Sequence, residues 1–503
     1  MELFLLLITV LFGVCSAGLG YGRKKLENKN QLINYHLHHE NGVKVQTSCD
    51  GIEELRFTDA VVDNFAPIES QVKWAGEGQR YWINKENWGG KGYPIFVFIG
   101  GEGAEACTRL TSKMYIYELA KEHKALLVDI EHRFYGESYP TEDMSTESLK
   151  FLSSTQALAD LARLIDHIKI DLNTKESKVI TVGGSYPGNL AAWFRLKYPS
   201  VTHGSIASSA PVTAKLNFYE YMEVVGKSIL YFGSQECYNE IETATKQIKQ
   251  ILSKGLNSEE VIQLSKDYKI CSKMENENDI KIFLSDLMGN IQGTVQYNNE
   301  HSGTMNITDV CNVMTKKDDG DAYTKFAKLN DLYLAAYGQE CVDASWKDTI
   351  EYMQASGKDS TNAARPWTYQ TCNEFGYYQT CDSSHQPFYA WKEYLNVDFY
   401  RDMCKESFNG WSKDPETEWI NEQYGEVHIE GSNILFPSGT IDPWHALGVT
   451  NSTKFNSNLN EVPVFILGTA HCNDLYAPNA DTDPVSLTQA RVVISEHIDK
   501  LLH

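Results

Sequence analysis

Basic residues are outnumbered in this 503-residue chain, and long apolar runs are missing from nearly all of it. Lys and Arg total 45 against 67 Asp and Glu, so the net charge of -22 repels phosphate backbones and anionic membrane surfaces. Nucleic acid is therefore not an expected partner. The apolar run Leu3–Val14 is too short to cross a bilayer, and no later stretch reaches about 18 uninterrupted apolar residues. We therefore expect no membrane span.

Familiar metal-ligand patterns are also lacking. The cluster of His36, His38 and His39 fits no zinc-site spacing, and no cysteine joins it. The acidic stretch at 318–321 lacks the ligand series of a calcium loop. We therefore expect neither a metal ion nor a cofactor.

Several features that are present indicate entry into the secretory pathway. Residues 1–17 resemble a signal peptide, because the first apolar run ends in small residues that suit cleavage near Ala17. Asn306 and Asn451 each begin a glycosylation acceptor pattern. The even number of cysteines after residue 17 fits disulfides in an oxidising compartment. These ten are Cys49, Cys107, Cys237, Cys271, Cys311, Cys341, Cys372, Cys381, Cys404 and Cys472. We expect a secreted or lysosomal protein.

The character of the chain changes three times after the signal segment. Residues 18–48 are polar and indicate an N-terminal extension or pro-segment. Residues 49–211 and 417–503 contain short apolar runs, whereas residues 212–416 show long helical patterns and hold seven of the ten cysteines. The prediction is one α/β domain in two parts, interrupted by a mainly helical cap that those seven cysteines brace.

The short apolar runs predict buried strands of a parallel sheet, because such strands are covered by helices on both faces. A helical pattern lies between two of them, at 157–168, and strands that alternate with helices imply an α/β sheet. The expected strands are Ile95–Ile99, Ala125–Ile130, Lys178–Val182, Ile434–Phe436 and Val462–Leu467.

The segment Val179–Gly188 runs from an expected strand into a helix and has Ser185 at the turn. This is the context of the nucleophile elbow of an α/β-hydrolase, in which small residues two before and two after the serine let strand and helix approach each other. Gly183 supplies the first small residue. Pro187 replaces the second, and Gly188 follows at once.

An acid and a histidine that follow Ser185 in the required order support the prediction of a nucleophile elbow. Asp442 comes shortly after one expected strand and His471 after the next. A serine hydroxyl becomes a good nucleophile when an imidazole takes its proton, and the acid fixes the tautomer of that imidazole. We therefore predict a Ser185, Asp442, His471 triad on an α/β-hydrolase fold.

An acyl transfer also needs two N–H donors for the developing oxyanion. The residue after the nucleophile, Tyr186, is expected to supply one. Gly101 or Glu102, in the loop after the first apolar strand, is placed to supply the other.

Beyond these residues, most of the chain after residue 48 resembles the serine exopeptidase family of lysosomal Pro-Xaa carboxypeptidase, dipeptidyl peptidase II and thymus-specific serine protease. Further motifs look most like the thymus-specific branch and its invertebrate relatives, notably Trp367 with Gln370–Gly376. The family signatures in this sequence are Glu131–Ser138, Gln156–Asp160, Gly183–Tyr186, Leu190–Trp193 and Asp442–Trp444.

The resemblance implies a helical cap over the site and exopeptidase action on short peptides, typically around proline and often at acidic pH. Proline-cleaving relatives tend to carry a methionine where this chain has Asn189, and an asparagine where it has Gly101, so a shift in specificity is expected. Trp444, two residues after the triad acid, is expected to offer a flat face for proline. With Asn189 and Glu102 it completes the expected substrate-binding residues.

Two other functions share some of these features. A lipase or esterase would use the same elbow, and a silent hydrolase-like binding protein would keep the fold without activity, although such proteins commonly lose a triad residue. Removal of one C-terminal residue needs a cation for the substrate carboxylate, and removal of an N-terminal dipeptide needs acidic or carbonyl groups for the amine. Both modes stay open, as does a homodimer.

Overall fold

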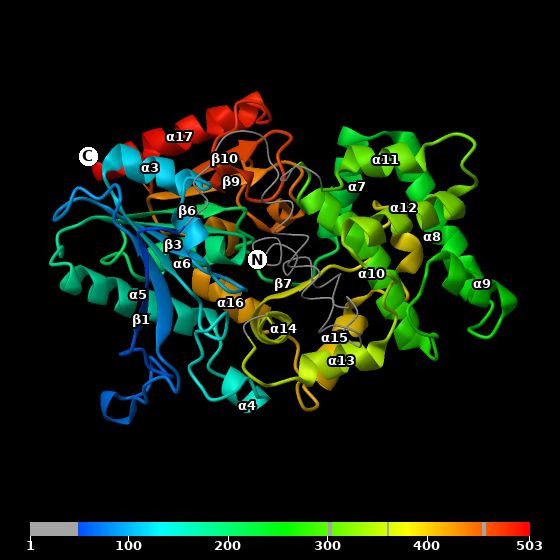
Figure 1. Ribbon diagram of the computed structural model, residues 1–503, viewed down its shortest axis with the longest axis horizontal. Helices are drawn as coiled ribbons and strands as arrows, with labels where there is room; N and C mark the ends of the chain where they lie inside the picture. Colours follow the sequence, from blue (N-terminus) through cyan, green and yellow to red (C-terminus); the bar gives the residue numbers. More distant parts are fainter. Residues whose placement is uncertain (1–48, 300–303, 360–361, 455–458) are drawn as a thin grey trace.

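A mostly parallel eight-stranded sheet forms one half of the molecule (Figure 1). The computed structural model describes residues 49–503 except 300–303, 360–361 and 455–458. The strand order is β1-β2-β4-β3-β5-β6-β9-β10, and β2 pairs antiparallel with both β1 and β4, whereas the other pairs are parallel. The strands are β1 (Ile52–Phe57), β2 (Gln79–Asn84), β3 (Ile95–Ile99), β4 (Leu126–Ile130), β5 (Val179–Gly184), β6 (Gly204–Ser208), β9 (Ile434–Gly439) and β10 (Val462–Ile466).

Apolar side chains cover both faces of this sheet, because successive residues of a strand point to opposite sides. In β3, Ile95, Val97 and Ile99 join the core on one side, and Phe96 and Phe98 join the core on the other. Four helices pack on these faces: α5 (Ser154–Asp171) and α6 (Tyr186–Lys197) on the first, and α3 (Tyr115–His123) and α17 (Val485–Leu502) on the second. Burial on both faces explains why the strands are unbroken apolar runs.

The second half of the molecule is built mainly from helices inserted between β6 and β9 (Figure 1, right). A two-stranded parallel pair, β7 (Lys215–Asn217) and β8 (Gly376–Tyr378), lies within the insertion. Its helices are α7 (Glu220–Phe232), α8 (Gln235–Leu252), α9 (Glu259–Asp267), α10 (Glu277–Gln296), α11 (Ile307–Met314), α12 (Ala322–Ala336), α13 (Trp346–Gln354), α14 (Ala364–Gln370) and α15 (Val397–Ser407). The last helix before β9, α16 (Thr417–Tyr424), packs on α6 of the sheet half, where Tyr424 stacks on Trp193 (Figure 1). The short helix α4 (Thr146–Leu149) belongs to the sheet half.

These elements confirm the predicted fold class, a parallel α/β sheet with a helical insertion. The expected strands agree with β3, β4, β5, β9 and β10 to within a few residues. The antiparallel pair β1 and β2 and the strand β6 were not foreseen. The division at 212 and 416 stays a prediction, and the signal peptide 1–17 and the pro-segment 18–48 lie outside the described residues.

Disulfides join eight of the cysteines, three pairs in the insertion and one in the sheet half. The pairs are Cys49–Cys107, Cys237–Cys311, Cys271–Cys341 and Cys372–Cys404. The expectation that seven cysteines brace the insertion is wrong, since six do and Cys381 is a free, buried thiol. Cys472 is the other free cysteine of the described ranges.

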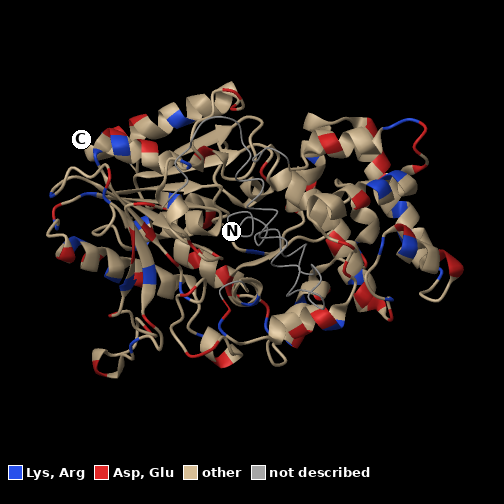
Figure 2. Ribbon diagram, viewed as in Figure 1, with Lys and Arg blue, Asp and Glu red and all other residues tan. Residues whose placement is uncertain are grey.

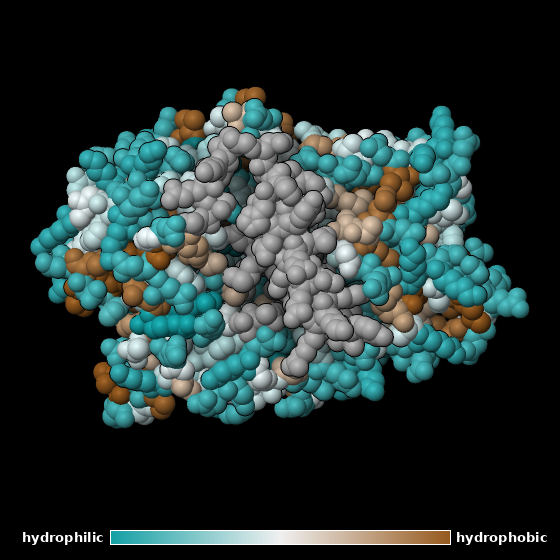
Figure 3. Space-filling view, viewed as in Figure 1, coloured by the Kyte–Doolittle hydropathy of each residue, from teal (hydrophilic) through white to brown (hydrophobic). Residues whose placement is uncertain are grey.

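Charged residues lie mainly on the outer helices and loops of both halves (Figure 2). The face in Figure 3 is largely hydrophilic, with apolar residues in small separate groups. Among the described helices, none has the length and apolar character that crossing a bilayer would require.

Candidate active site

The turn between β5 and α6 holds Ser185 in a strained conformation. Its backbone has φ 64° and ψ -133°, a left-handed φ that non-glycine residues rarely adopt. The Ser185 amide donates to the Ser208 carbonyl on β6 at 2.9 Å, which fixes the turn against the neighbouring strand. This is the geometry of a nucleophile elbow.

Three glycines near the turn allow the backbone to approach closely. A Cβ at Gly183 would lie 2.1 Å from the Pro187 carbonyl oxygen, and one at Gly188 would lie 2.6 Å from the Ser208 carbonyl oxygen. A Cβ at Gly101 would lie 2.3 Å from Cγ of Pro187. The proline ring therefore occupies the space that a side chain at position 101 would need. The departure from the elbow pattern at Pro187 and the departure from the relatives' asparagine at Gly101 are thus sterically linked.

The predicted acid and histidine lie together at the same edge of the sheet. Asp442 follows β9 and His471 follows β10, and His471 Nδ1 lies 2.9 Å from Asp442 Oδ2. The Trp444 amide donates to Asp442 Oδ1 at 3.0 Å, so both carboxylate oxygens are fixed. Asp442 is fully buried and His471 is 3% exposed.

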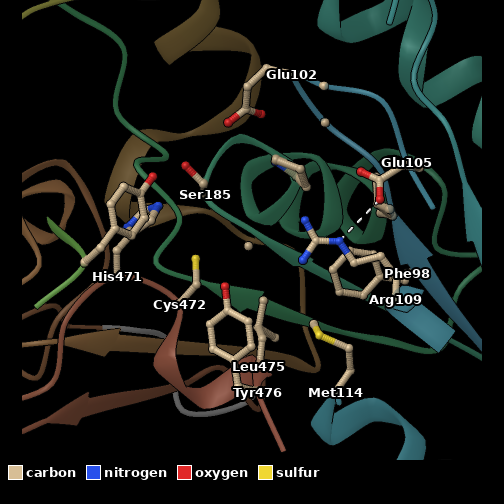
Figure 4. Close-up of a pocket in the computed structure, with 16 residues that line it drawn as sticks. Phe98, Glu102, Glu105, Arg109, Met114, Ser185, His471, Cys472, Leu475 and Tyr476 are labelled. Carbon is tan, nitrogen blue, oxygen red and sulfur yellow. Dashed lines mark ion pairs between the residues drawn. The ribbon is translucent and has the colours of Figure 1, made fainter. Parts of the chain in front are cut away.

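A pocket brings Ser185 and His471 together (Figure 4). Ser185 and His471 both line this pocket, and Nε2 of His471 has no hydrogen-bond partner among the described residues. That nitrogen is the one that would take a proton from a serine nucleophile. The arrangement can therefore perform nucleophilic attack with general-base assistance.

The charge of Asp442 governs the protonation of His471. Burial disfavours the imidazolium, but the Asp442 carboxylate, together with a smaller contribution from the neighbouring Cys472, outweighs this penalty and raises the pKa of His471 well above its usual value. In this free state the histidine holds a proton more strongly than an ordinary imidazole does.

Glu102 faces Ser185 across the pocket (Figure 4). The residue is 8% exposed, and its Oε2 has no partner within the described part of the chain. Burial raises the pKa of Glu102 to about 7. A buried carboxyl group with an unused oxygen is suited to accept a hydrogen bond from a ligand.

Arg109 lies at the other end of the pocket and is held by its neighbours. Its Nε lies 3.4 Å from Glu105 Oε2, and its guanidinium stacks over the Phe98 ring at 5.5 Å (Figure 4). The pocket lining therefore includes an arginine as well as acidic side chains, which are the kinds of group that bind the two ends of a short peptide.

The predicted oxyanion donors lie beside these groups. Gly101 lines the pocket, and Tyr186 begins α6 directly after the nucleophile. The Tyr186 side chain is buried, with its hydroxyl 3.0 Å from His132 Nε2 and accepting from Gln370 Nε2 at 2.9 Å. These contacts orient the residue whose backbone N–H follows Ser185.

Buried ion pairs explain two of the family signatures. Arg133 makes a two-pronged contact with Asp160 at 2.6 and 2.7 Å, which joins the segment after β4 to α5. Arg80 on β2 pairs with Glu131 in the same way, at 2.5 and 3.1 Å. The signatures thus hold the sheet together beneath the site.

Residues 60–494 match the model of the family described as serine carboxypeptidase S28. The chain belongs to this family. A protein from Caenorhabditis elegans is 33% identical over 503 residues, covering 94% of this chain and 89% of its own. Mouse thymus-specific serine protease is 31% identical, and the alignment covers 84% of this chain and 83% of the mouse protein. Bovine lysosomal Pro-X carboxypeptidase is also 31% identical, and the alignment covers 87% of this chain and 85% of the bovine protein. Among solved structures, a proline iminopeptidase from Mycobacterium smegmatis aligns with 84% of this chain and 96% of its own at 11% identity, with a TM-score of 0.36. The family match and the similar peptidases show that the chain is a serine peptidase, as its sequence predicted.

Two predicted substrate-binding residues of this S28 peptidase do not line the pocket. Trp444 is 3% exposed and packs against Phe218, Tyr221 and Tyr377. Asn189 is fully buried, and its amide donates to the Pro211 carbonyl at 3.1 Å and to the Tyr377 hydroxyl at 3.2 Å. Both lie beneath the site.

Among the residues of the site that sequence reasoning missed, three lie close to the histidine. Tyr297, at the end of α10, and Cys472, next to the histidine, line the pocket. Gln296 is buried and accepts from the His471 amide through its main-chain carbonyl at 2.9 Å. Cys472 is adjacent to the histidine in sequence, but no local pattern marks Gln296 or Tyr297, because only the folded insertion brings them there.

The glycosylation candidates differ in their surroundings. Asn451 lies in an exposed turn, whereas Asn306 is half-buried and caps α11 by accepting from the Asp309 amide at 2.9 Å. Modification at either position stays a prediction. Within the described ranges, no group of three or more His, Cys, Asp or Glu side chains is placed to hold a metal ion.

Proposed function

We propose that this chain is a serine exopeptidase that hydrolyses short peptides next to proline through an acyl-enzyme. Ser185 is the nucleophile, His471 the general base and Asp442 the acid that orients it. The observation that carries the proposal is the 2.9 Å contact between His471 and Asp442, with His471 and Ser185 in one pocket.

In the first half of the reaction, His471 Nε2 takes the proton of Ser185 Oγ as that oxygen attacks the scissile carbonyl. The backbone N–H groups of Tyr186 and Gly101 stabilise the oxyanion. The imidazolium then gives its proton to the leaving amine, and water releases the acyl group with His471 again as the base.

In this proposal, the enzyme selects short peptides by binding one of their charged ends. Glu102 offers a carboxyl oxygen that is suited to accept a hydrogen bond from a free α-amine, and Arg109 offers a cation that is suited to a free α-carboxylate, because both side chains line the pocket with the serine. Part of the pocket wall is apolar and allows a proline ring to pack against it; this part consists of Phe98, Met114 and Leu475. Burying such a ring contributes about 1 to 2 kcal/mol, enough for a roughly five- to thirtyfold preference.

We also propose where in or outside the cell the enzyme acts. The apolar segment within residues 1–17 and the four disulfides support delivery through the secretory pathway, to the outside of the cell or to the lysosome.

The test is turnover of one proline-containing peptide with free ends and of two forms blocked at the amino or carboxyl end, measured for wild type and Ser185→Ala. We expect Ser185→Ala to lower turnover by about 10⁶-fold without a change in melting temperature. Loss of cleavage on blocking one end identifies which end is bound. Equal cleavage of all three forms would contradict exopeptidase action, and short-chain esters as the better substrates would favour the esterase alternative.

A further inference from the structure

Gln296, at the end of α10, is a fully buried residue of the helical insertion that contacts the loops of the catalytic centre. Its Oε1 accepts from Trp444 Nε1 at 2.9 Å and from the Tyr221 hydroxyl at 2.7 Å. Its Nε2 donates to the Tyr297 hydroxyl at 2.6 Å. One amide thus connects α10, α7 and the loop after β9.

Both ends of the Asp442–His471 pair depend on these contacts. Trp444, whose ring Gln296 holds, gives its own amide to Asp442 Oδ1 at 3.0 Å. The main-chain carbonyl of Gln296 meanwhile accepts from the amide of His471 at 2.9 Å. The acid loop and the histidine loop of the sheet are therefore tied to the same residue of the insertion.

We propose that Gln296 is a positioning residue of the catalytic centre. It fixes the position of Asp442 through Trp444 and that of His471 through its own main-chain carbonyl. The inference rests on the proposed triad. It gives the insertion a part in the chemical step, because a triad loses rate steeply when its members shift by a fraction of an ångström.

The Gln296 side chain hydrogen-bonds three partners at once, of which Trp444 and Tyr221 are buried and Tyr297 is half-buried. Replacing Gln296 by leucine keeps a side chain of similar size but leaves the Trp444 indole N–H and the Tyr221 hydroxyl without their acceptor. A buried donor left without a partner is unfavourable. The indole is then free to move, and the acid loop moves with it.

The experiment compares Gln296→Leu with Gln292→Leu. Gln292 is equally buried one turn earlier on α10, but its amide donates to Gln379 at 2.9 Å, away from the triad loops. We expect Gln296→Leu to lower kcat by about 10²-fold with little change in KM, and Gln292→Leu to leave kcat within threefold, roughly the scale of one hydrogen bond. The rate of Ser185 labelling by a small fluorophosphonate should fall in parallel with kcat.

The pH dependence supplies a readout that a merely structural role would not move. A displaced Asp442 supports the imidazolium less well, so the acid limb of the kcat profile should shift to lower pH in Gln296→Leu and stay in place in Gln292→Leu. Equal losses in the two variants, or a change in KM alone, would overturn the inference.

Trp444→Phe decides the matter if Gln296→Leu does not fold, because it removes the indole donor and keeps an aromatic ring. We expect it to lower kcat while KM stays constant, and a wild-type kcat would refute the inference. Where both single variants fold, Gln296→Leu should cost less in the Trp444→Phe background. Ser185→Ala is assayed beside them: if it retains turnover, the proposed function fails, and if it is inactive while both glutamine variants behave alike, only the role of Gln296 fails.

Discussion

The sheet half and the helical insertion contribute to the site in different ways. The sheet supplies Ser185, Asp442 and His471 from loops directly after β5, β9 and β10, where short sequence patterns mark them. The insertion contributes Gln296 and Tyr297 from the end of α10, with no local pattern. Residues that lie in loops at strand ends can thus be predicted from short sequence patterns. Residues that an insertion brings to the site can be identified only in the folded structure.

The largest effect is expected from a substitution in the sheet loops alone, which tests whether these loops carry the chemistry. We expect Asp442→Asn to lower kcat by about 10⁴-fold with the fold retained, because the imidazole loses the acceptor that sets its tautomer. Asp442 raises the pKa of His471, so its removal should also move the acid limb of the rate profile to lower pH. The measurement is kcat against pH, and an unmoved acid limb would contradict the coupling.

Within the sheet half, the Arg133–Asp160 pair should matter to stability more than to chemistry. Asp160→Ala leaves the fully buried Arg133 guanidinium without its compensating carboxylate, although main-chain carbonyls still contact it, and such a loss typically lowers the free energy of unfolding by about 3 to 5 kcal/mol. Asp166→Ala, at an exposed position of the same helix, is the matched control. Urea denaturation measures both, and similar values for the two variants would show that the ion pair has no structural role.

The disulfides allow the two halves to be loosened separately. Replacing Cys237 and Cys311 by alanine should cost about 2 to 4 kcal/mol and raise hydrogen exchange in α7, α8 and α11, while β3 and β5 stay protected. Replacing Cys49 and Cys107 should instead affect the sheet half. Loss of protection first in β3 and β5 of the former variant would contradict a separately braced insertion.

The smallest expected effect concerns the two departures near the elbow. Gly101→Asn should lower the free energy of unfolding by about 1 to 3 kcal/mol, because the new side chain meets the Pro187 ring. Adding Pro187→Gly should restore most of that loss. Thermal denaturation of the single and double variants tests the link, and additive effects would show that positions 101 and 187 are independent.

Much of the sheet half could be predicted because its signals are local. Ile95–Ile99 is apolar throughout since both sheet faces are covered, and the order of Ser185, Asp442 and His471 follows from the strands that precede them. The strand β6 is small and polar, Gly204–Ser208, so its apolar signal is weak.

The insertion and the pocket were less accessible to prediction. Trp444 was expected to offer a flat face for proline, but Phe218, Tyr221 and Tyr377 surround it, and each comes from a segment distant from it in sequence. Cys381 counted toward an even set of ten cysteines, yet pairing depends on distances that only the folded chain defines.

The most direct test of the central claim is to label the active enzyme with a fluorophosphonate and map the modified residue by mass spectrometry while peptide turnover is followed. We expect one phosphonyl group per chain, on Ser185, with turnover lost in proportion to labelling. Modification of another residue, or full turnover in a chain labelled at Ser185, would contradict the assignment of Ser185 as the nucleophile of this S28 peptidase.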